Sequence, residues 1–175
     1  MASKIILTVV ALFGVVQYAS AFDCSQMKDH AEEISKCCSA PSPWPEAELK
    51  ECFQTKYEGG VEDQVICAVD CSLKKLGVMN EAGELDKAKA LEYPEKHLQG
   101  EWRDTYKATI EECFGKLEQM KSKAAEAQAN FKCPVLPMSL HVCVSDKMFH
   151  RCPSEHWHTS QICEDVKKHD CLERD

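Results

Sequence analysis

Apolar residues recur every three to four positions along most of the chain, separated by Lys, Glu and Asp. A period of about 3.6 residues is typical of helices that bury one face. No strand-like alternation of useful length, internal repeat or low-complexity linker interrupts this pattern. We therefore predict a single all-α domain of six to eight helices, over residues 24–38, 46–57, 61–76, 84–91, 95–129 with a bend at Gly115, 139–152 and 160–171.

Proline and glycine mark the expected ends of these helices. Residues 41–45 contain three prolines and follow the first helix, and Gly77 follows the third. Proline lacks the backbone N–H that a helix interior needs, and glycine readily adopts the left-handed conformation at a helix C-terminus. We likewise expect Pro94 and Pro153 to separate helices.

The first 21 residues have the composition of a secretory signal peptide. A short polar start precedes an apolar run over residues 5–16, and Ala19-Ser20-Ala21 fits a cleavage site before Phe22. The run is too short to span a bilayer comfortably, and no later stretch reaches 18 apolar residues. We predict an exported protein without a membrane anchor, in which residues 22–175 form the mature domain.

The charge balance narrows the class of partner. The chain has 21 Lys and Arg against 29 Asp and Glu, a formal net charge of −8, and loss of residues 1–21 removes only Lys4 and gives −8 − 1 = −9. The basic residues are interleaved with acidic ones and form no stripe that could gather phosphates. This distribution of charge argues against nucleic acid and anionic lipid surfaces as partners, and favours a freely diffusing solute as the partner.

All twelve cysteines follow the expected cleavage site. An even number in an exported chain predicts six disulfides. Cys37 and Cys38 are adjacent and poorly placed to bond each other, so we expect them to have different partners. Cys67 and Cys71 stand at i and i+4, on one face of a helix, where they can tie that helix to two neighbouring segments.

Six of the cysteines form the series Cys67-x3-Cys71-x41-Cys113-x19-Cys133-x9-Cys143-x8-Cys152, with Pro153 directly after it. This series resembles that of the insect odorant-binding proteins, and specifically of their Plus-C subgroup, which adds cysteines to the basic six and places a proline after the sixth. In this likeness Cys133 and Cys163 are added cysteines, and the second to sixth family cysteines are Cys67, Cys71, Cys113, Cys143 and Cys152.

The resemblance also implies a disulfide connectivity. Cys38, Cys37 and Cys52 all precede Cys67, and we prefer Cys38 as the first family cysteine. In the family the first cysteine bonds the third, the second the fifth, and the fourth the sixth. The implied pairs are Cys38–Cys71, Cys67–Cys143 and Cys113–Cys152, and the pairing of Cys24, Cys37, Cys52, Cys133, Cys163 and Cys171 stays open.

As a member of this family the chain would be a helical shell around an apolar cavity. It would carry small hydrophobic ligands, such as odorants, pheromones, other semiochemicals or lipids, through extracellular fluid, and would act in olfaction if expressed in sensory tissue. The likeness implies no catalysis and no cofactor, and admits a homodimer and a membrane odorant receptor as partners. The alternative is a secreted protein-binding or inhibitory module, of the salivary or venom type, on the same scaffold.

Apolar side chains at helical spacing are the candidates for the cavity wall, although each also fits a filled core. Tyr106 and Met148 are favoured, because one is amphipathic and the other adaptable. Each disulfide typically contributes about 2–4 kcal/mol, so we hypothesise that cross-links substitute for a filled core. The candidates are Leu73, Leu76, Trp102, Tyr106, Ile110, Phe114, Leu140, Val144, Met148 and Phe149.

Other chemistries fit less well. A thiol and three imidazoles that could ligate zinc gather late in the chain, but the thiol is expected in a disulfide, so we predict no metal site. These histidines, with His141 and His169, are alternative proton sensors. No G-x-S-x-G sequence indicates a serine hydrolase. A secreted phospholipase is also disfavoured, because Cys37-Cys38 is not followed by a suitably spaced His-Asp, no glycine-rich calcium loop is present, and His169-Asp170 adjoins Cys171 at the extreme end. The residues of the zinc alternative are His150, Cys152, His156 and His158.

Overall fold

The computed structural model describes residues 24–42 and 44–169. The predicted signal peptide and Cys171 lie outside these residues. The described chain contains α-helices and short 3-10 helices, with two isolated β-bridges and no strand, which confirms the all-α prediction. The elements are η1 (Cys24–Lys28), α1 (Ala31–Ile34), α2 (Glu46–Gln54), α3 (Val61–Lys75), α4 (Lys87–His97), α5 (Gly100–Gly115), α6 (Leu117–Ala127), η2 (Gln128–Asn130), α7 (Leu136–His150), η3 (Ser154–His156) and α8 (Gln161–His169).

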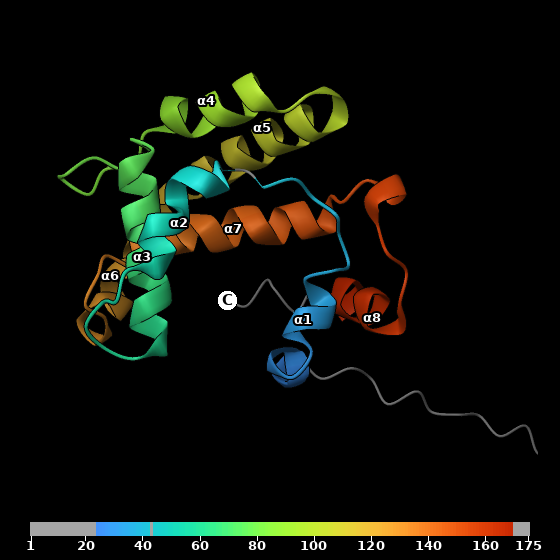
Figure 1. Cartoon of the computed structure of the whole chain (residues 1–175), viewed down its shortest axis with the longest axis horizontal. Helices are drawn as coiled ribbons and strands as arrows, with labels where there is room; N and C mark the ends of the chain where they lie inside the picture. The colour runs from blue at the N-terminus through green and yellow to red at the C-terminus, as the bar shows by residue number, and fades with distance from the viewer. Residues whose placement is uncertain (1–23, 43, 170–175) are drawn as a thin grey trace, which may run out of the picture.

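Helix α7 runs through the middle of the fold, and the other helices are arranged around it (Figure 1). Helices α3, α5 and α6 pack against α7, while α2 packs on α3 and α4 on α5. Helices α1 and α8 pack on each other as a separate pair. The first and last α-helices of the described chain are therefore neighbours, outside the main bundle.

The main bundle has a packed interior. Leu73 of α3, Ile110 of α5 and Leu140 of α7 are each at most 2% exposed and belong to one cluster of buried side chains. Burying a leucine or isoleucine side chain stabilises a fold by about 1.5–3 kcal/mol. The hypothesis that cross-links substitute for a filled core is therefore wrong for this bundle.

A second, smaller cluster joins the α1–α8 pair. Ile34 of α1 and Val166 of α8 are buried together, and Met27, Ile162 and Phe149 pack against them. Phe149 belongs to α7. The pair is thus attached to the last turn of the central helix by apolar contacts as well as by disulfides.

The first predicted helix, over residues 24–38, is broken in the structure into η1 and α1. After Ile34 the chain makes one more turn, and beyond it the backbone bonds to residues far away in the sequence. The Ser39 N–H donates to the His156 carbonyl at 2.9 Å, and the His158 N–H donates to the Cys37 carbonyl at 2.8 Å. Residues 38–42 therefore lie outside any helix and form what is called here the extended segment. The periodicity of the sequence did not predict it.

The boundary expected at Pro94 lies elsewhere. Helix α4 continues through Pro94 to His97, and the chain turns at Leu98 and Gly100, whose φ is +56°. Pro94 lies in the last turn of α4, where the loss of one N–H removes a single hydrogen bond of the helix. The predicted helix over residues 95–129 is divided at Lys116 into α5 and α6, beside the bend expected at Gly115.

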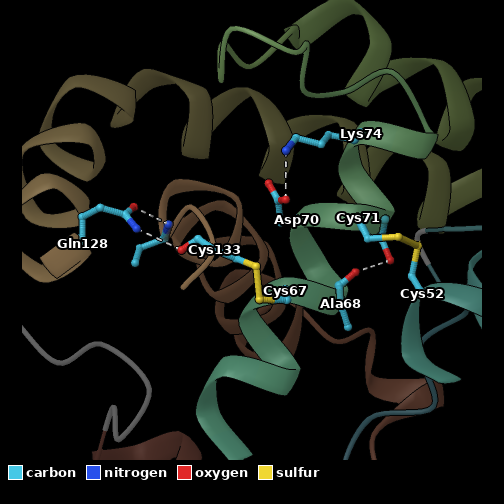
Figure 2. A network of polar contacts seen from close by, with 10 residues as sticks. Cys52, Cys67, Ala68, Asp70, Cys71, Lys74, Gln128 and Cys133 are labelled. Carbon is cyan, nitrogen blue, oxygen red and sulfur yellow. Dashed lines mark hydrogen bonds and ion pairs between the residues drawn. A yellow bond between two sulfur atoms is a disulfide. The ribbon is translucent and has the colours of Figure 1, made fainter. Parts of the chain in front are cut away.

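Disulfides fix α3 on two sides, as Cys67 and Cys71 at i and i+4 predicted. Cys67 bonds Cys133 and Cys71 bonds Cys52, so that α3 is tied to the loop before α7 and to α2 (Figure 2). Cys113 of α5 bonds Cys143 of α7. These three bonds connect the helices of the main bundle.

Two further bonds hold the segment that follows α1. Cys37 bonds Cys163 of α8, and Cys38 bonds Cys152 just beyond α7. Adjacent cysteines with different partners were predicted. Cys24 is also disulfide-bonded.

The three predicted pairs, Cys38–Cys71, Cys67–Cys143 and Cys113–Cys152, are wrong. Cys38 does not reach Cys71 because it lies on the extended segment beside Trp157, whereas α2 places Cys52 directly against α3. The family order of first to third, second to fifth and fourth to sixth nevertheless holds. It applies to the set Cys52, Cys67, Cys71, Cys113, Cys133 and Cys143.

The loop before α7 is fixed by side-chain hydrogen bonds in addition to the Cys67–Cys133 bond. The Gln128 side chain donates to the Cys133 carbonyl and accepts from the Val135 N–H, both at 3.0 Å (Figure 2). Asp63 accepts from the Lys132 N–H at 2.9 Å. These bonds set where α7 begins, and thereby the register of the residues that it presents.

Candidate ligand-binding groove

A groove of about 590 Å³ lies between α7 and the segment formed by α1 and the residues after it. Its volume is within the range of about 300–1,000 Å³ that is usual for small-molecule sites. Most of its lining side chains are apolar. They are Ile34, Ser35, Cys38, Ala40, Pro41, Ser42, Tyr106, Met138, His141, Val142, Val144, Ser145, Asp146, Met148 and Phe149.

Helix α7 supplies one wall of the groove. Met138, Val142, Ser145 and Phe149 follow one another at intervals of three and four residues, which brings them to one face of a helix. Pro137 in the first turn of α7 favours the start of the helix at this point. The wall is therefore part of a rigid element that the main core supports from behind.

The opposite wall is the extended segment around Cys38. The Cys37–Cys163 and Cys38–Cys152 bonds hold this segment at one end, and it pairs with Trp157 through a β-bridge. Pro41 restricts its backbone further along. The disulfides thus fix a second layer of chain at a distance from α7, outside the packed bundle.

Tyr106 of α5 connects the main bundle to the extended segment. Its side chain is only 2% exposed and lines the groove, and its hydroxyl donates a hydrogen bond of 2.6 Å to the Pro41 carbonyl. Burial, with a smaller contribution from Tyr93, raises the pKa of Tyr106, so the hydroxyl remains a donor at any physiological pH. This bond anchors the extended segment to the main bundle.

Polar groups are few in the groove. Burial lowers the pKa of His141, which keeps this imidazole neutral near pH 7. Ser35, Ser42 and Ser145 add hydroxyl groups, and Asp146 adds a carboxylate. An apolar surface with a few polar groups suits an amphiphilic molecule that has a small polar end.

A second cleft, of about 390 Å³, lies between α4 and the C-terminal end of α3. It combines Trp44, Leu76 and Tyr93 with several charged side chains. Glu92 forms ion pairs there with Lys89 and Lys96. This cleft is smaller and more polar than the groove beside α7, and it suits an apolar ligand less well.

The ten predicted wall residues are distributed over several environments. Four line the groove: Tyr106, Val144, Met148 and Phe149. Leu73, Ile110 and Leu140 are buried in the main core, and Leu76 lines the second cleft. Trp102 and Phe114 are partly buried against the main core, and the ring of Trp102 lies 4.9 Å from that of His156.

The wall formed by the extended segment was not predicted from the sequence. Its residues have no helical period. Of the two disulfides that position it, the Cys37–Cys163 pairing was left open and Cys38 was assigned the wrong partner. The proline-rich residues 41–45 directly after the adjacent Cys37 and Cys38 were the available signal for a tethered, non-helical wall. On α7, the spacing of Met138, Val142 and Ser145 was readable from the sequence.

The zinc alternative lacks its thiol, because Cys152 is bonded to Cys38. Across the described part of the chain, no three His, Cys, Asp or Glu side chains are grouped so that they could hold a metal ion. Within the same residues, every helix is too short or too polar for a membrane span.

Comparison with known proteins places this disulfide-linked helical fold in a family. The sequence profile of the PBP/GOBP family matches residues 20–135, which is 116 of the 175 residues. The chain therefore belongs to the PBP/GOBP family of insect odorant-binding proteins, whose members are non-enzymatic carriers of small hydrophobic ligands. No curated protein and no solved structure gives a significant match. The matched region contains Tyr106 and the extended segment and ends just before α7.

Proposed function

We propose that this protein is a secreted carrier that binds a small hydrophobic ligand in the groove between α7 and the extended segment. The observation that carries the proposal is the groove itself. Apolar side chains from two covalently linked walls surround about 590 Å³ of space, with few polar groups among them. Membership of a carrier family supports the same function.

The expected affinity suits a protein that must both load and release its cargo. A ligand that buries roughly 300 Å² of apolar surface gains about 7–8 kcal/mol, before the free energy of association is subtracted. Micromolar binding is realistic on this scale. The flexible Met138 and Met148 side chains allow the groove to adapt to ligands of different shape.

We also propose that the protein is exported and that it belongs to the Plus-C subgroup. The signal-like first 21 residues and the disulfides support secretion into extracellular fluid. The Cys37–Cys163 and Cys38–Cys152 bonds are additional to the three bonds of the six-cysteine framework, and this fits the Plus-C subgroup. In a sensory tissue the cargo would be an odorant or a pheromone.

Displacement of a fluorescent apolar probe tests the carrier function. The mature protein is titrated with N-phenyl-1-naphthylamine, and the bound probe is then competed with ten-carbon alcohols, aldehydes and esters. Saturable probe binding with displacement at micromolar concentrations supports the proposal. Absence of probe binding, together with capture of one specific protein by the folded chain, would instead support a protein-binding module.

A further inference from the structure

Most polar side chains of the groove already have a partner within the protein. The hydroxyl groups of Ser35, Ser42 and Tyr106 each donate a hydrogen bond to a backbone carbonyl, at 2.8, 2.8 and 2.6 Å. Their donors are therefore not available to a ligand. Among the described residues that line the groove, the side chains with oxygen or nitrogen atoms are Ser35, Ser42, Tyr106, His141, Ser145 and Asp146.

Asp146 is also occupied by neighbours. It is only 5% exposed, and its Oδ1 atom is buried and lies 3.5 Å from the His150 Nε2. Its Oδ2 atom lies 3.6 Å from the Lys147 Nζ. The carboxylate of Asp146 therefore interacts with residues of its own helix, and a ligand in the groove does not reach its buried Oδ1 atom.

His141 and Ser145 are the two lining residues whose polar groups remain free. Within the part of the chain that the structure describes, neither side chain makes a hydrogen bond or an ion pair. Ser145 is exposed, and neither ring nitrogen of the half-buried His141 is among the buried atoms that lack a partner, so these polar atoms are accessible. The two residues stand at i and i+4 on α7, which brings their side chains together on one face of the helix.

The pair offers hydrogen bonds without charge. A hydroxyl group can donate and accept, and a neutral imidazole donates from one nitrogen and accepts at the other. Burial lowers the pKa of His141, so the ring is neutral near pH 7. The described lining contains no Lys or Arg, and a carboxylate transferred from water into the groove would therefore meet no opposite charge.

We propose that His141 and Ser145 form the polar end of the ligand site, and that they hold the hydroxyl or carbonyl oxygen of an uncharged ligand. The inference rests on the proposed carrier function and specifies its ligand class. An alcohol can accept from one of the two side chains and donate to the other, and a ketone can accept from both. A hydrocarbon would displace water from both side chains and leave them without a partner, which is unfavourable.

The test uses three ligands that share one ten-carbon skeleton and differ at a single carbon: limonene has no oxygen, carveol has a hydroxyl group and carvone has a carbonyl group. Each is competed with N-phenyl-1-naphthylamine at pH 7.4. His141→Phe keeps a ring and removes both nitrogens, so the affinity for carveol and carvone should fall about five- to ten-fold, while that for limonene should change by less than about two-fold. Ser145→Ala should lower the affinity for the two oxygenated ligands by about three- to five-fold.

Two further variants serve as controls. Ser122→Ala makes the same change as Ser145→Ala at an exposed position of α6, and should leave the affinity for all three ligands unaltered. His141→Gln replaces the imidazole by an amide that can both donate and accept. It should retain more of the affinity for carveol and carvone than His141→Phe does.

The outcomes separate this inference from the carrier function. If none of the three ligands displaces the probe, the carrier function fails and the inference fails with it. If the ligands bind, but His141→Phe and Ser145→Ala affect limonene as much as carveol and carvone, or affect none of them, the carrier function stands and the inference is overturned. If His141→Phe does not fold, Ser145→Ala decides, because Ser145 lies at an exposed position.

Discussion

The hydroxyl of Tyr106 donates a hydrogen bond of 2.6 Å to the carbonyl of Pro41, 65 residues earlier in the chain. The bond joins α5 in the main bundle to the extended segment that forms one wall of the groove. Tyr106 is thus both a lining residue and the support of the opposite wall. Tyr106 therefore belongs both to the packed core and to the lining of the groove.

Tyr106→Phe tests the support of the wall. The substitution keeps the ring and leaves the Pro41 carbonyl without its donor, so the free energy of unfolding should fall by about 1–2 kcal/mol. Ligand affinity should fall by about ten-fold, because the wall loses its attachment. Chemical denaturation and probe displacement measure the two effects.

Tyr57→Phe is the matched control. The Tyr57 hydroxyl donates to the Cys52 carbonyl at 3.0 Å, away from the groove. This variant should lose a similar free energy of unfolding and keep the affinity of the unmodified protein. Equal loss of affinity in both variants would show that Tyr106 has no specific role in the groove.

Removal of one disulfide tests whether the bonds outside the main bundle hold the groove open. The double replacement Cys38→Ser and Cys152→Ser frees the extended segment from the end of α7. Stability should fall by about 2–4 kcal/mol, and probe affinity should fall by an order of magnitude. Thermal unfolding and probe titration provide the two measurements.

A disulfide of the main bundle provides the comparison. Cys52→Ser with Cys71→Ser removes the bond between α2 and α3. Loss of stability is expected here too, by about 2–4 kcal/mol, with probe affinity unchanged at temperatures where the protein is folded. If binding is lost in this variant and retained without the Cys38–Cys152 bond, the assignment of the wall is wrong.

Filling the groove should abolish binding without unfolding the protein. Ser145 is an exposed residue of α7 that lines the groove, so Ser145→Trp introduces a large side chain without entering the main core. We expect probe affinity to fall at least about ten-fold while the melting temperature stays within a few degrees of its original value. The control is Ser122→Trp on the exposed face of α6, where binding should be unaffected.

The free energy of unfolding should decrease as the pH falls below the pKa of an unperturbed imidazole. Burial lowers the pKa of His141, so below about pH 6.5 the unfolded chain takes up a proton at this residue more readily than the folded chain does. The resulting loss of stability grows until the pH reaches the lowered pKa of the folded state. His141→Gln should flatten the dependence, by at most about 1.4 kcal/mol per pH unit, in unfolding measured from pH 7.5 to 5. An unchanged slope would contradict this assignment.

Much of the main bundle could be predicted from the sequence. The apolar period located α3 and α7, and the i, i+4 spacing of Cys67 and Cys71 predicted a helix tied on two sides. Helical periodicity indicates which residues are buried, but it does not indicate which part of the fold each of them packs against. Ile110 and Val144 therefore look alike in the sequence, although only Val144 reaches the groove.

The groove could not be predicted, because it is formed by contacts between residues that are far apart in the sequence. Cys38 was assigned to the wrong partner because spacing leaves the choice among three early cysteines open, and only the fold places Cys38 beside Cys152. The extended wall has no period, since its backbone bonds residues more than a hundred positions away, as in the pair Ser39 and His156. Asp146 was not singled out, because an acidic residue in an amphipathic helix usually lies on the solvated face.

The position of the bound ligand distinguishes the groove beside α7 from every other site. Uniformly 15N-labelled protein is titrated with decan-1-ol, and the amide resonances are followed by heteronuclear correlation spectroscopy. The largest shifts should fall on residues 34–42 and 138–149, on the two sides of the groove. Shifts concentrated around Trp44, Leu76 and Tyr93 in the second cleft, or no shifts at saturating ligand, would contradict this prediction.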